Sequence, residues 1–214
     1  MERYDFPRQA LAVCLSCVAG YVDAVGFMSA DSYFVSFMSG NTTRLAVDLA
    51  SDWRLALTPA ALIAGFVMGV ALGNLIATKA GRWRKPAVLA LVGLLLFAGA
   101  LTEATGLRTA SLATLVLAMG ALNNTFQRDG EVAIGLTYMT GALVRLGQAI
   151  GARLTGQKRS GWLAYLLLWI GLAGGALGGA KAFLSIGGAA LWLATAAIAL
   201  LVAMTFRLAL RDTA

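Results

Sequence analysis

Two segments of the chain carry the same polar pattern around a glycine and an arginine. Residues 38–45 read MSGNTTRL, and 101 positions later residues 139–146 read MTGALVRL, with four identities and one Ser-for-Thr exchange. An arginine guanidinium can make a bidentate contact with a carboxylate, a phosphate or a planar heterocycle. Charge at membrane depth is costly and usually functional. The repeat therefore predicts a binding role for Arg44 and Arg145.

Each copy also predicts the start of a short helix. Ser39 and Thr140 are suitable N-caps for the residues that follow them. A helix over residues 40–50 is long enough for roughly half of the bilayer core. Its first turn would offer free backbone N–H groups and a positive dipole end to an anion. The predicted substrate contacts at the two starts are Ser39, Gly40, Asn41, Thr42 and Arg44 in the first copy, and Thr140, Gly141 and Arg145 in the second.

The two arginines also have structural interpretations. Asp23 and Asp48 are the acidic residues available within the apolar segments, and an ion pair would neutralise both partners. Each arginine could instead extend to the nearer membrane interface, because its stem is apolar. Ligand contact, ion pairing and extension to the interface all stay open at the level of the sequence.

Asp23 is predicted to be the proton-coupling residue. At the offset of 101, residues 20–23 (GYVD) align with residues 121–124 (ALNN), so this acid corresponds to Asn124 in the other copy. Desolvation disfavours the charged form of a lone acid in an apolar helix, which lets such a group carry a proton. The alternative is a hydrogen bond from Asp23 to a neighbouring helix.

A polar run interrupts the apolar stretch that begins near residue 109. Asn123, Asn124 and Gln127 occur close together, and an apolar span does not tolerate such polarity without a reason. With Asn41 and Thr42 they are predicted to line a hydrogen-bonding pocket for a small polar solute.

The composition indicates an integral membrane protein. Of 214 residues, 59% are hydrophobic and 13% are charged, whereas soluble domains carry about a quarter charged residues. The net charge of +7 comes from Lys and Arg in short loops, which is typical of cytoplasmic loops, so we expect no nucleic-acid partner. Membrane spans of sufficient length are predicted near residues 9–29, 56–78, 86–104, 109–127, 161–180 and 186–207.

The predicted fold is an all-α membrane domain over residues 1–214, built from two repeats of about 9–105 and 109–208. Each repeat would contain three spanning helices and one broken or re-entrant half-helix. Glycines four residues apart in both repeats are typical of close helix packing in lipid. These glycines are Gly65, Gly69 and Gly73 in the first repeat, and Gly171, Gly175 and Gly179 in the second.

Loop charges favour re-entry of the two motif segments. With re-entry, twelve of the fifteen Lys and Arg residues outside the motifs are cytoplasmic, against nine when every segment crosses. Three crossings per half then require opposite orientations of the two halves. That is the inverted-repeat architecture of many secondary transporters. Both the N-terminus and the C-terminus are predicted to be cytoplasmic.

Three parts of the chain resemble the YoaK-like family, a group of bacterial multispanning membrane proteins. They are GYVDAVGF (20–27), FVSFMSGNTTRLA (34–46) and GALNNTFQRDG with TYMTGALVRL (120–130 and 137–146). The resemblance covers nearly the whole chain. It implies a location in the bacterial inner membrane, and it carries over no substrate, reaction or site residue.

The expected function is secondary transport of a small polar or anionic solute, with proton coupling through Asp23 and a midplane site at the half-helix starts. A passive channel is the alternative, because half-helices also build pores; an intramembrane enzyme or a non-transporting partner is less favoured. No catalytic residue, metal site or cofactor is predicted: the chain lacks His, and Cys14 and Cys17 read as small side chains on one helix face. The expected partners are the lipid bilayer and the solute, and the glycine faces leave room for a homo-oligomer.

Overall fold

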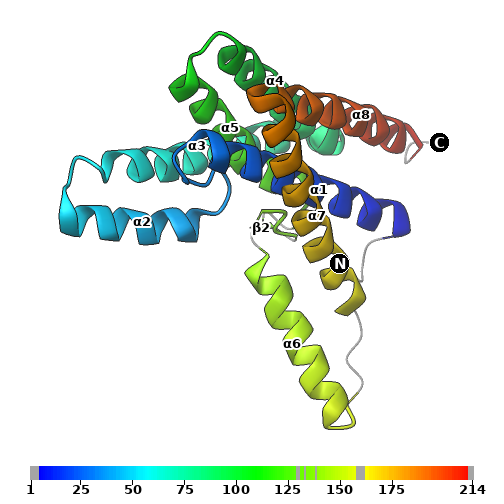
Figure 1. Ribbon diagram of the computed structural model, residues 1–214. Coiled ribbons are helices and arrows are strands. Elements are labelled where there is room, and N and C mark those ends of the chain that lie inside the picture. The colour runs from blue at the N-terminus through cyan, green and yellow to red at the C-terminus, as the bar shows by residue number, and fades with distance from the viewer. Residues whose placement is uncertain (1–4, 129–130, 133, 138, 158–161, 212–214) are drawn as a thin grey trace.

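Helices dominate the structure. The computed structural model describes residues 5–128, 131–132, 134–137, 139–157 and 162–211 (Figure 1). The eight α-helices among these residues are α1 (Phe6–Ser29), α2 (Met38–Ser51), α3 (Leu57–Ala80), α4 (Arg84–Ala104), α5 (Arg108–Leu122), α6 (Thr140–Leu154), α7 (Trp162–Ile186) and α8 (Ala190–Arg211). Three 3-10 turns adjoin them, η1 (Gly81–Trp83), η2 (Asn123–Thr125) and η3 (Gly187–Ala189). Strands β1 (Gln127–Arg128) and β2 (Glu131–Val132) form a short antiparallel pair.

Within the described residues, three helical stretches are long and apolar enough to cross a membrane. They are Phe6–Ser29, Leu57–Ala104 and Trp162–Arg207. The second contains α3 and α4, and the third contains α7 and most of α8. Large apolar side chains on them face outward; Leu94 and Leu184 are both more than half exposed. Such surface suits lipid rather than water, so an all-helical membrane protein is confirmed.

The fourth predicted span, near 109–127, is shorter than expected. Helix α5 has 15 residues and gives way to the 3-10 turn η2 at Asn123, whereas a crossing needs roughly 20 residues. The side chain of Asn123 donates to the Met119 carbonyl, and the Thr125 hydroxyl donates to the Leu122 carbonyl. Short polar side chains compete in this way with the helical hydrogen bonds of the backbone. The polar run therefore ends the helix early.

The two halves pack against each other in the same way: the first helix of each half lies against the third helix of the other. Helix α1 packs against α7 of the other half, and α5 packs against α3. The glycines make this possible: a Cβ at Gly175 would meet the carbonyl oxygen of Cys17, and one at Gly73 would lie 2.8 Å from the carbonyl oxygen of Ala121. Backbones can approach so closely only where both side chains are small. The packing role predicted for the glycine ridges is confirmed.

The apolar core lies where these pairs meet α4 and α8. Leu15 of α1, Val92 of α4, Leu115 of α5 and Ile198 of α8 are all fully buried in one cluster. Helix α4 packs against both α5 and α8. The core therefore joins the two halves, which fits a single folding unit.

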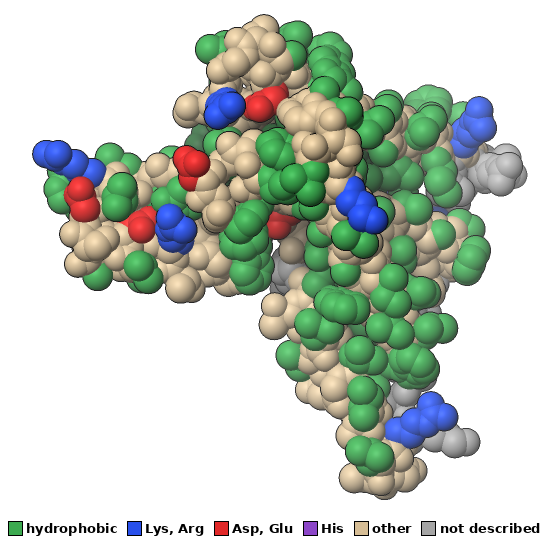
Figure 2. Space-filling model, viewed as in Figure 1, with side chains coloured by type: hydrophobic (Ala, Val, Ile, Leu, Met, Phe, Trp, Pro, Cys, Tyr) green, Lys and Arg blue, Asp and Glu red, His purple; other side chains and the backbone are tan. Residues whose placement is uncertain are grey.

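Two short helices project from this body as arms (Figure 1). Helix α2 packs beside α3, and α6 packs beside α7. Connections of a few residues, after Ser51 and after Leu154, join the members of each pair. Figure 2 shows hydrophobic side chains along the α6 arm at the bottom of the view, and acidic and basic side chains together on the α2–α3 arm at the left. The arms correspond to the two motif segments, so the structure places the motifs on helices of 14 and 15 residues.

Candidate functional site: a polar cavity beside α2

The segment between α1 and α2 folds back along the end of α1. Asp31 and Ser32 take left-handed conformations, with φ of 46° and 67°, and short polar residues adopt these more readily than branched ones. Beyond this reversal the Phe34 ring lies 4.8 Å from the ring of Phe27. Val35 then packs on Gly26, where a Cβ would lie 2.7 Å from a Val35 methyl group. The chain thus returns to the level of the last turns of α1 before α2 begins.

Asp23 fixes this returning segment. Its Oδ1 accepts hydrogen bonds from the backbone N–H groups of Val35 at 2.9 Å and Ser36 at 2.7 Å. Asn41 of α2 adds a reciprocal pair with Phe34, donating to its carbonyl at 2.7 Å and accepting from its N–H at 3.0 Å. These contacts satisfy backbone groups that have no helical partner. The structure therefore gives Asp23 and buried Asn41 positioning roles.

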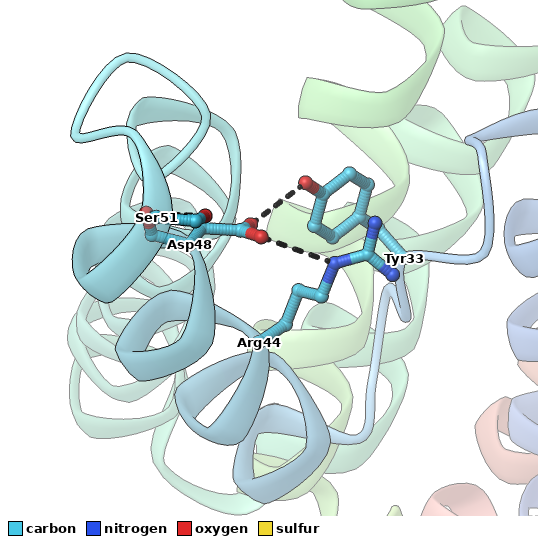
Figure 3. Close-up of polar contacts among 4 residues, drawn as sticks. All are labelled: Tyr33, Arg44, Asp48 and Ser51. Atoms are coloured by element: carbon cyan, nitrogen blue, oxygen red, sulfur yellow. Dashed lines mark hydrogen bonds and ion pairs between the residues drawn. The ribbon is translucent and has the colours of Figure 1, made fainter.

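Arg44 and Asp48 of α2 form a compact charged group with the phenol of Tyr33, which precedes the helix (Figure 3). Arg44 Nε lies 3.5 Å from Asp48 Oδ1, and the Tyr33 hydroxyl donates to Asp48 Oδ2 at 3.1 Å. The guanidinium carbon of Arg44 lies 4.9 Å from the centre of the Tyr33 ring. Burial, and then the hydrogen bond and the charge of Asp48, raise the pKa of the Tyr33 phenol above its ordinary value. The phenol is therefore a neutral donor near pH 7.

An open cavity of about 400 Å³ lies against this charged group. Its lining comes from residues 32–48 alone, and it includes Ser32, Gly40, Asn41, Arg44 and Asp48. The Asp48 side chain is 8% exposed, whereas that of Arg44 is 47% exposed. In Figure 3 the terminal nitrogens of Arg44 point away from Asp48. The two terminal nitrogens of the guanidinium therefore keep donors for a solute while Nε pairs with a buried acid.

The predicted N-caps are wrong. Phe37 caps α2 and Met139 caps α6, neither with a side-chain capping bond, so Ser39 and Thr140 already lie inside their helices. The reason is that the chain enters α2 through backbone contacts: the N–H groups of Gly40 and Asn41 both bond to the Phe37 carbonyl. The exposed hydroxyl of Thr42 donates to the Met38 carbonyl on the same helix. The start of α2 therefore offers fewer free N–H groups than expected.

The second half uses Asn123 where the first half uses Asp23. Asn123 Oδ1 accepts from the backbone N–H of Leu136 at 3.2 Å, and its amide donates to the Thr137 hydroxyl at 3.0 Å. Leu136 and Thr137 lie 101 positions after Val35 and Ser36. The predicted pairing of Asp23 with Asn124 is therefore displaced by one residue. The turn η2 explains it, because a 3-10 turn rotates successive residues by more than an α-helix does.

Asn124 and Gln127 instead bind the first half. The Asn124 amide donates to the Val70 carbonyl of α3 at 3.0 Å. The Gln127 amide donates to Asn124 Oδ1 and, at 3.0 Å, to Asn74 Oδ1. Gly73 leaves room for this approach, since a Cβ there would lie 2.6 Å from the Asn124 amide nitrogen. This cluster joins α3 to the end of α5.

The motif residues of the second half lie away from the cavity. Thr140, Gly141 and Arg145 are exposed on α6, and the Arg145 guanidinium lies 5.0 Å from the ring centre of Tyr165 on α7. The counterpart of Asp48 at offset 101 is Ala149, so the ion pair has no equivalent in α6. Among the predicted site residues, the structure gathers Gly40, Asn41 and Arg44 around one cavity and places the second-half residues elsewhere.

Sequence reasoning did not identify Tyr33, Ser32 or Asn74 as parts of these sites. One signal was available: Arg44 and Asp48 are four residues apart, a spacing that puts opposite charges on one helix face. Tyr33 and Ser32 precede α2 in an irregular segment, and Asn74 sits inside the glycine-rich α3. No periodic pattern marks such residues.

The fold and the site define a class, the helical integral membrane proteins that span the bilayer several times. The chain belongs to the family described as "Protein of unknown function (DUF1275)", which matches residues 11–204. It is 38% identical over 200 residues to the UPF0700 transmembrane protein RA0705 of Rhizobium meliloti (strain 1021), covering 93% of this chain and 86% of the relative. It is 28% identical over 161 residues to the UPF0700 transmembrane protein YoaK of Bacillus subtilis (strain 168), covering 71% of each. The resemblance to the YoaK-like family is confirmed, and no solved structure matches.

Proposed function

We propose that this protein is a secondary transporter of a small polar or anionic solute in the bacterial inner membrane, and that the cavity beside α2 binds the solute. The observation that carries the proposal is Arg44, a half-exposed cation that lines an open cavity on one of the two motif helices. Its guanidinium can bind a carboxylate or phosphate in two parallel hydrogen bonds. Ser32 and Thr43 line the same cavity, and their hydroxyl groups suit further polar contacts.

The proposed architecture is an inverted repeat with both termini in the cytoplasm. The packing of the helices supports this architecture, because α1 packs on α7 and the corresponding helices of the other repeat, α5 and α3, pack on each other as well. Two halves related by a pseudo-two-fold axis can rock against each other around a fixed site. When α2 and α6 re-enter, each half crosses the membrane three times, so the two halves have opposite orientations. The distribution of loop Lys and Arg residues favours this re-entry.

Proton coupling through Asp23 is part of the proposal. Asp23 holds the segment that leads into α2, so a proton on this carboxylate would weaken the two bonds that position the cavity wall. Asn123 performs the same task in the other half without a titrating group. One half would thus respond to the proton gradient while the other stays fixed.

A passive channel is the second candidate. The observation in its favour is that Asp23 Oδ1 already accepts two backbone bonds at 2.7 and 2.9 Å. These bonds give the carboxylate a structural role that needs no proton transfer. If that is its whole role, the cavity serves downhill passage alone.

A ligand screen tests the binding role of the cavity. Purified protein is heated in the presence of small carboxylates, phosphate esters and polar heterocycles, and its unfolding temperature is measured. The proposal expects one class to stabilise the wild type but not Arg44→Gln. The matched control is Arg108→Gln, an exposed arginine at the start of α5. Equal stabilisation of the wild type and Arg44→Gln would exclude Arg44 as a ligand contact.

A further inference from the structure

A second cavity, of about 530 Å³, lies between α6 and α7 near the end of their arm. Leu146, Ala149 and Ile150 of α6 form an apolar part of its lining. Arg153, in the last turn of α6, and Trp162, the first residue of α7, line it as well. The cavity therefore combines an apolar wall with a cation and an indole ring.

No acidic residue of the surrounding helices can neutralise Arg153. Residues 132–211 contain no Asp and no Glu, so α6, α7 and α8 carry no carboxylate side chain. The Arg153 side chain is exposed. A cation that lines an apolar cavity and has no acid on its own arm is complementary to an external anion.

The outer face of α6 is strongly apolar. Val144, Ile150 and Leu154 are each more than half exposed, and Figure 2 shows hydrophobic side chains along this arm with a basic side chain near its tip. Tryptophan is enriched at the level of lipid headgroups, and Trp162, the first residue of α7, lines the same cavity. The α6–α7 arm thus matches a phospholipid along its length, with apolar side chains where the acyl chain would lie and a cation near the tip where the headgroup would lie.

The other arm differs at the equivalent point. Position 52 lies 101 residues before Arg153 and holds an aspartate, Asp52, whose Oδ1 accepts a hydrogen bond from the N–H of Arg54. Trp53 lies between Asp52 and Arg54, so each arm has a tryptophan in or next to the connection between its helices, but only the α6–α7 arm presents a cation without an acid. The difference makes the α2–α3 arm an internal control.

We propose that the cavity between α6 and α7 binds an anionic phospholipid of the inner membrane. One acyl chain lies against Leu146 and Ile150, and the headgroup phosphate pairs with Arg153. The Trp162 indole lies at the boundary between chain and headgroup. Basic pockets between membrane helices recognise anionic headgroups in this way. The site is separate from the α2 cavity, whose lining residues it does not share.

Fluorescence quenching by brominated lipids tests this proposal. Full-length protein that keeps Trp162 as its single tryptophan, with the other four changed to Phe, is reconstituted with phosphatidylglycerol or phosphatidylcholine carrying brominated acyl chains. One basic contact near the membrane surface corresponds to a preference of about fivefold. We expect phosphatidylglycerol to quench Trp162 with about that preference, and Arg153→Gln to remove it.

The control protein keeps Trp53 alone and should show no preference between the two lipids. Because Arg153 is exposed, its replacement should leave folding intact, which circular dichroism and gel filtration verify. Equal quenching of Trp162 by both lipids, a preference that survives Arg153→Gln, or the same preference at Trp53 would each overturn the proposal.

Discussion

Asp23 and Asn123 hold equivalent backbone segments of the two halves through the same side-chain atom. Asp23 Oδ1 accepts from Val35 and Ser36, and Asn123 Oδ1 accepts from Leu136, which lies 101 residues after Val35. A carboxamide therefore suffices for this task in one half. The positioning role of Asp23 and its proposed proton-coupling role can be separated on that basis.

Asp23→Asn should fold nearly as well as the wild type, and Asp23→Leu should not. The amide oxygen of Asn can still accept from Val35 and Ser36, whereas Leu leaves both N–H groups without a partner. Losing hydrogen bonds to a charged group costs about 2 to 3 kcal/mol. Unfolding in a graded detergent mixture measures the difference. Asp52→Leu, at an exposed residue with an extended backbone, is the control, and an Asp23→Leu protein as stable as the wild type would contradict the positioning role.

The Asp23→Asn variant also tests proton coupling. If Asp23 carries the coupled proton, Asp23→Asn abolishes uphill solute accumulation driven by a pH gradient in proteoliposomes and leaves downhill exchange intact. Asp52→Asn, an exposed acid on the arm, should change neither. Accumulation that persists in Asp23→Asn would show that another group carries the proton, whereas a wild type that never accumulates solute in a pH gradient would favour the passive channel.

Gly175 and Gly174 offer a matched pair on α7. A Cβ at Gly175 would meet the Cys17 carbonyl of α1, whereas nothing lies within 4 Å of one at Gly174. Overpacking of a close contact typically costs about 2 kcal/mol, so Gly175→Ala should lower the unfolding temperature. Gly174→Ala should match or exceed the wild type, because alanine is the better helix former. Equal behaviour of the two variants would show that α1 and α7 are less closely packed than described.

Apolar runs and the spacing of glycines predicted the long helices and their close packing. The glycine ridges packed as expected, and five of the six predicted spans coincide with α1, α3, α4, α7 and α8 to within a few residues at most ends. The motif segments are short helices of 14 and 15 residues. The length of an apolar run and the spacing of small residues are local properties, so they can be recognised without knowing what each helix packs against.

The site was less predictable because hydrogen bonds to the backbone determine where its polar side chains lie. Asn41 and Asn123 read as solute ligands, but each holds an irregular segment through main-chain groups. A polar side chain that satisfies a distant backbone group and one that lines a pocket have the same identity in the sequence. The 3-10 turn after α5 added a one-residue shift that an ungapped repeat alignment does not show.

The two motif arginines should differ in ligand binding. Arg44 lines the α2 cavity, whereas Arg145 lies over Tyr165 on the other arm. We expect Arg44→Gln to abolish stabilisation by the ligand that the screen identifies, and Arg145→Gln to keep it. Loss of binding in both variants would indicate that one solute contacts both halves.

Asp48→Asn should reveal the charge of the solute. Asp48 Oδ1 lies 3.5 Å from Arg44 Nε, so its removal leaves the guanidinium less neutralised. An anionic ligand should then bind about tenfold more tightly, given the strength of charge interactions at partly buried sites. A neutral ligand should bind with unchanged affinity. Calorimetric titration of the wild type and of Asp48→Asn distinguishes an anionic ligand from a neutral one. Weaker anion binding in Asp48→Asn would mean that the ion pair shapes the cavity and does not compete with the ligand for Arg44.

Accessibility of the two arm tips tests the inverted repeat. With Cys14 and Cys17, both free thiols, changed to Ser, single cysteines are placed at the exposed positions Arg54 and Gln157. If α2 and α6 re-enter, Arg54→Cys faces the outside and Gln157→Cys faces the cytoplasm. A membrane-impermeant maleimide should then label Arg54→Cys in intact spheroplasts and Gln157→Cys only after permeabilisation. If all eight helices cross instead, both positions are cytoplasmic and neither reacts before permeabilisation. The positive-inside bias predicts the first outcome, since re-entry places the basic residues between α3 and α4 in the cytoplasm.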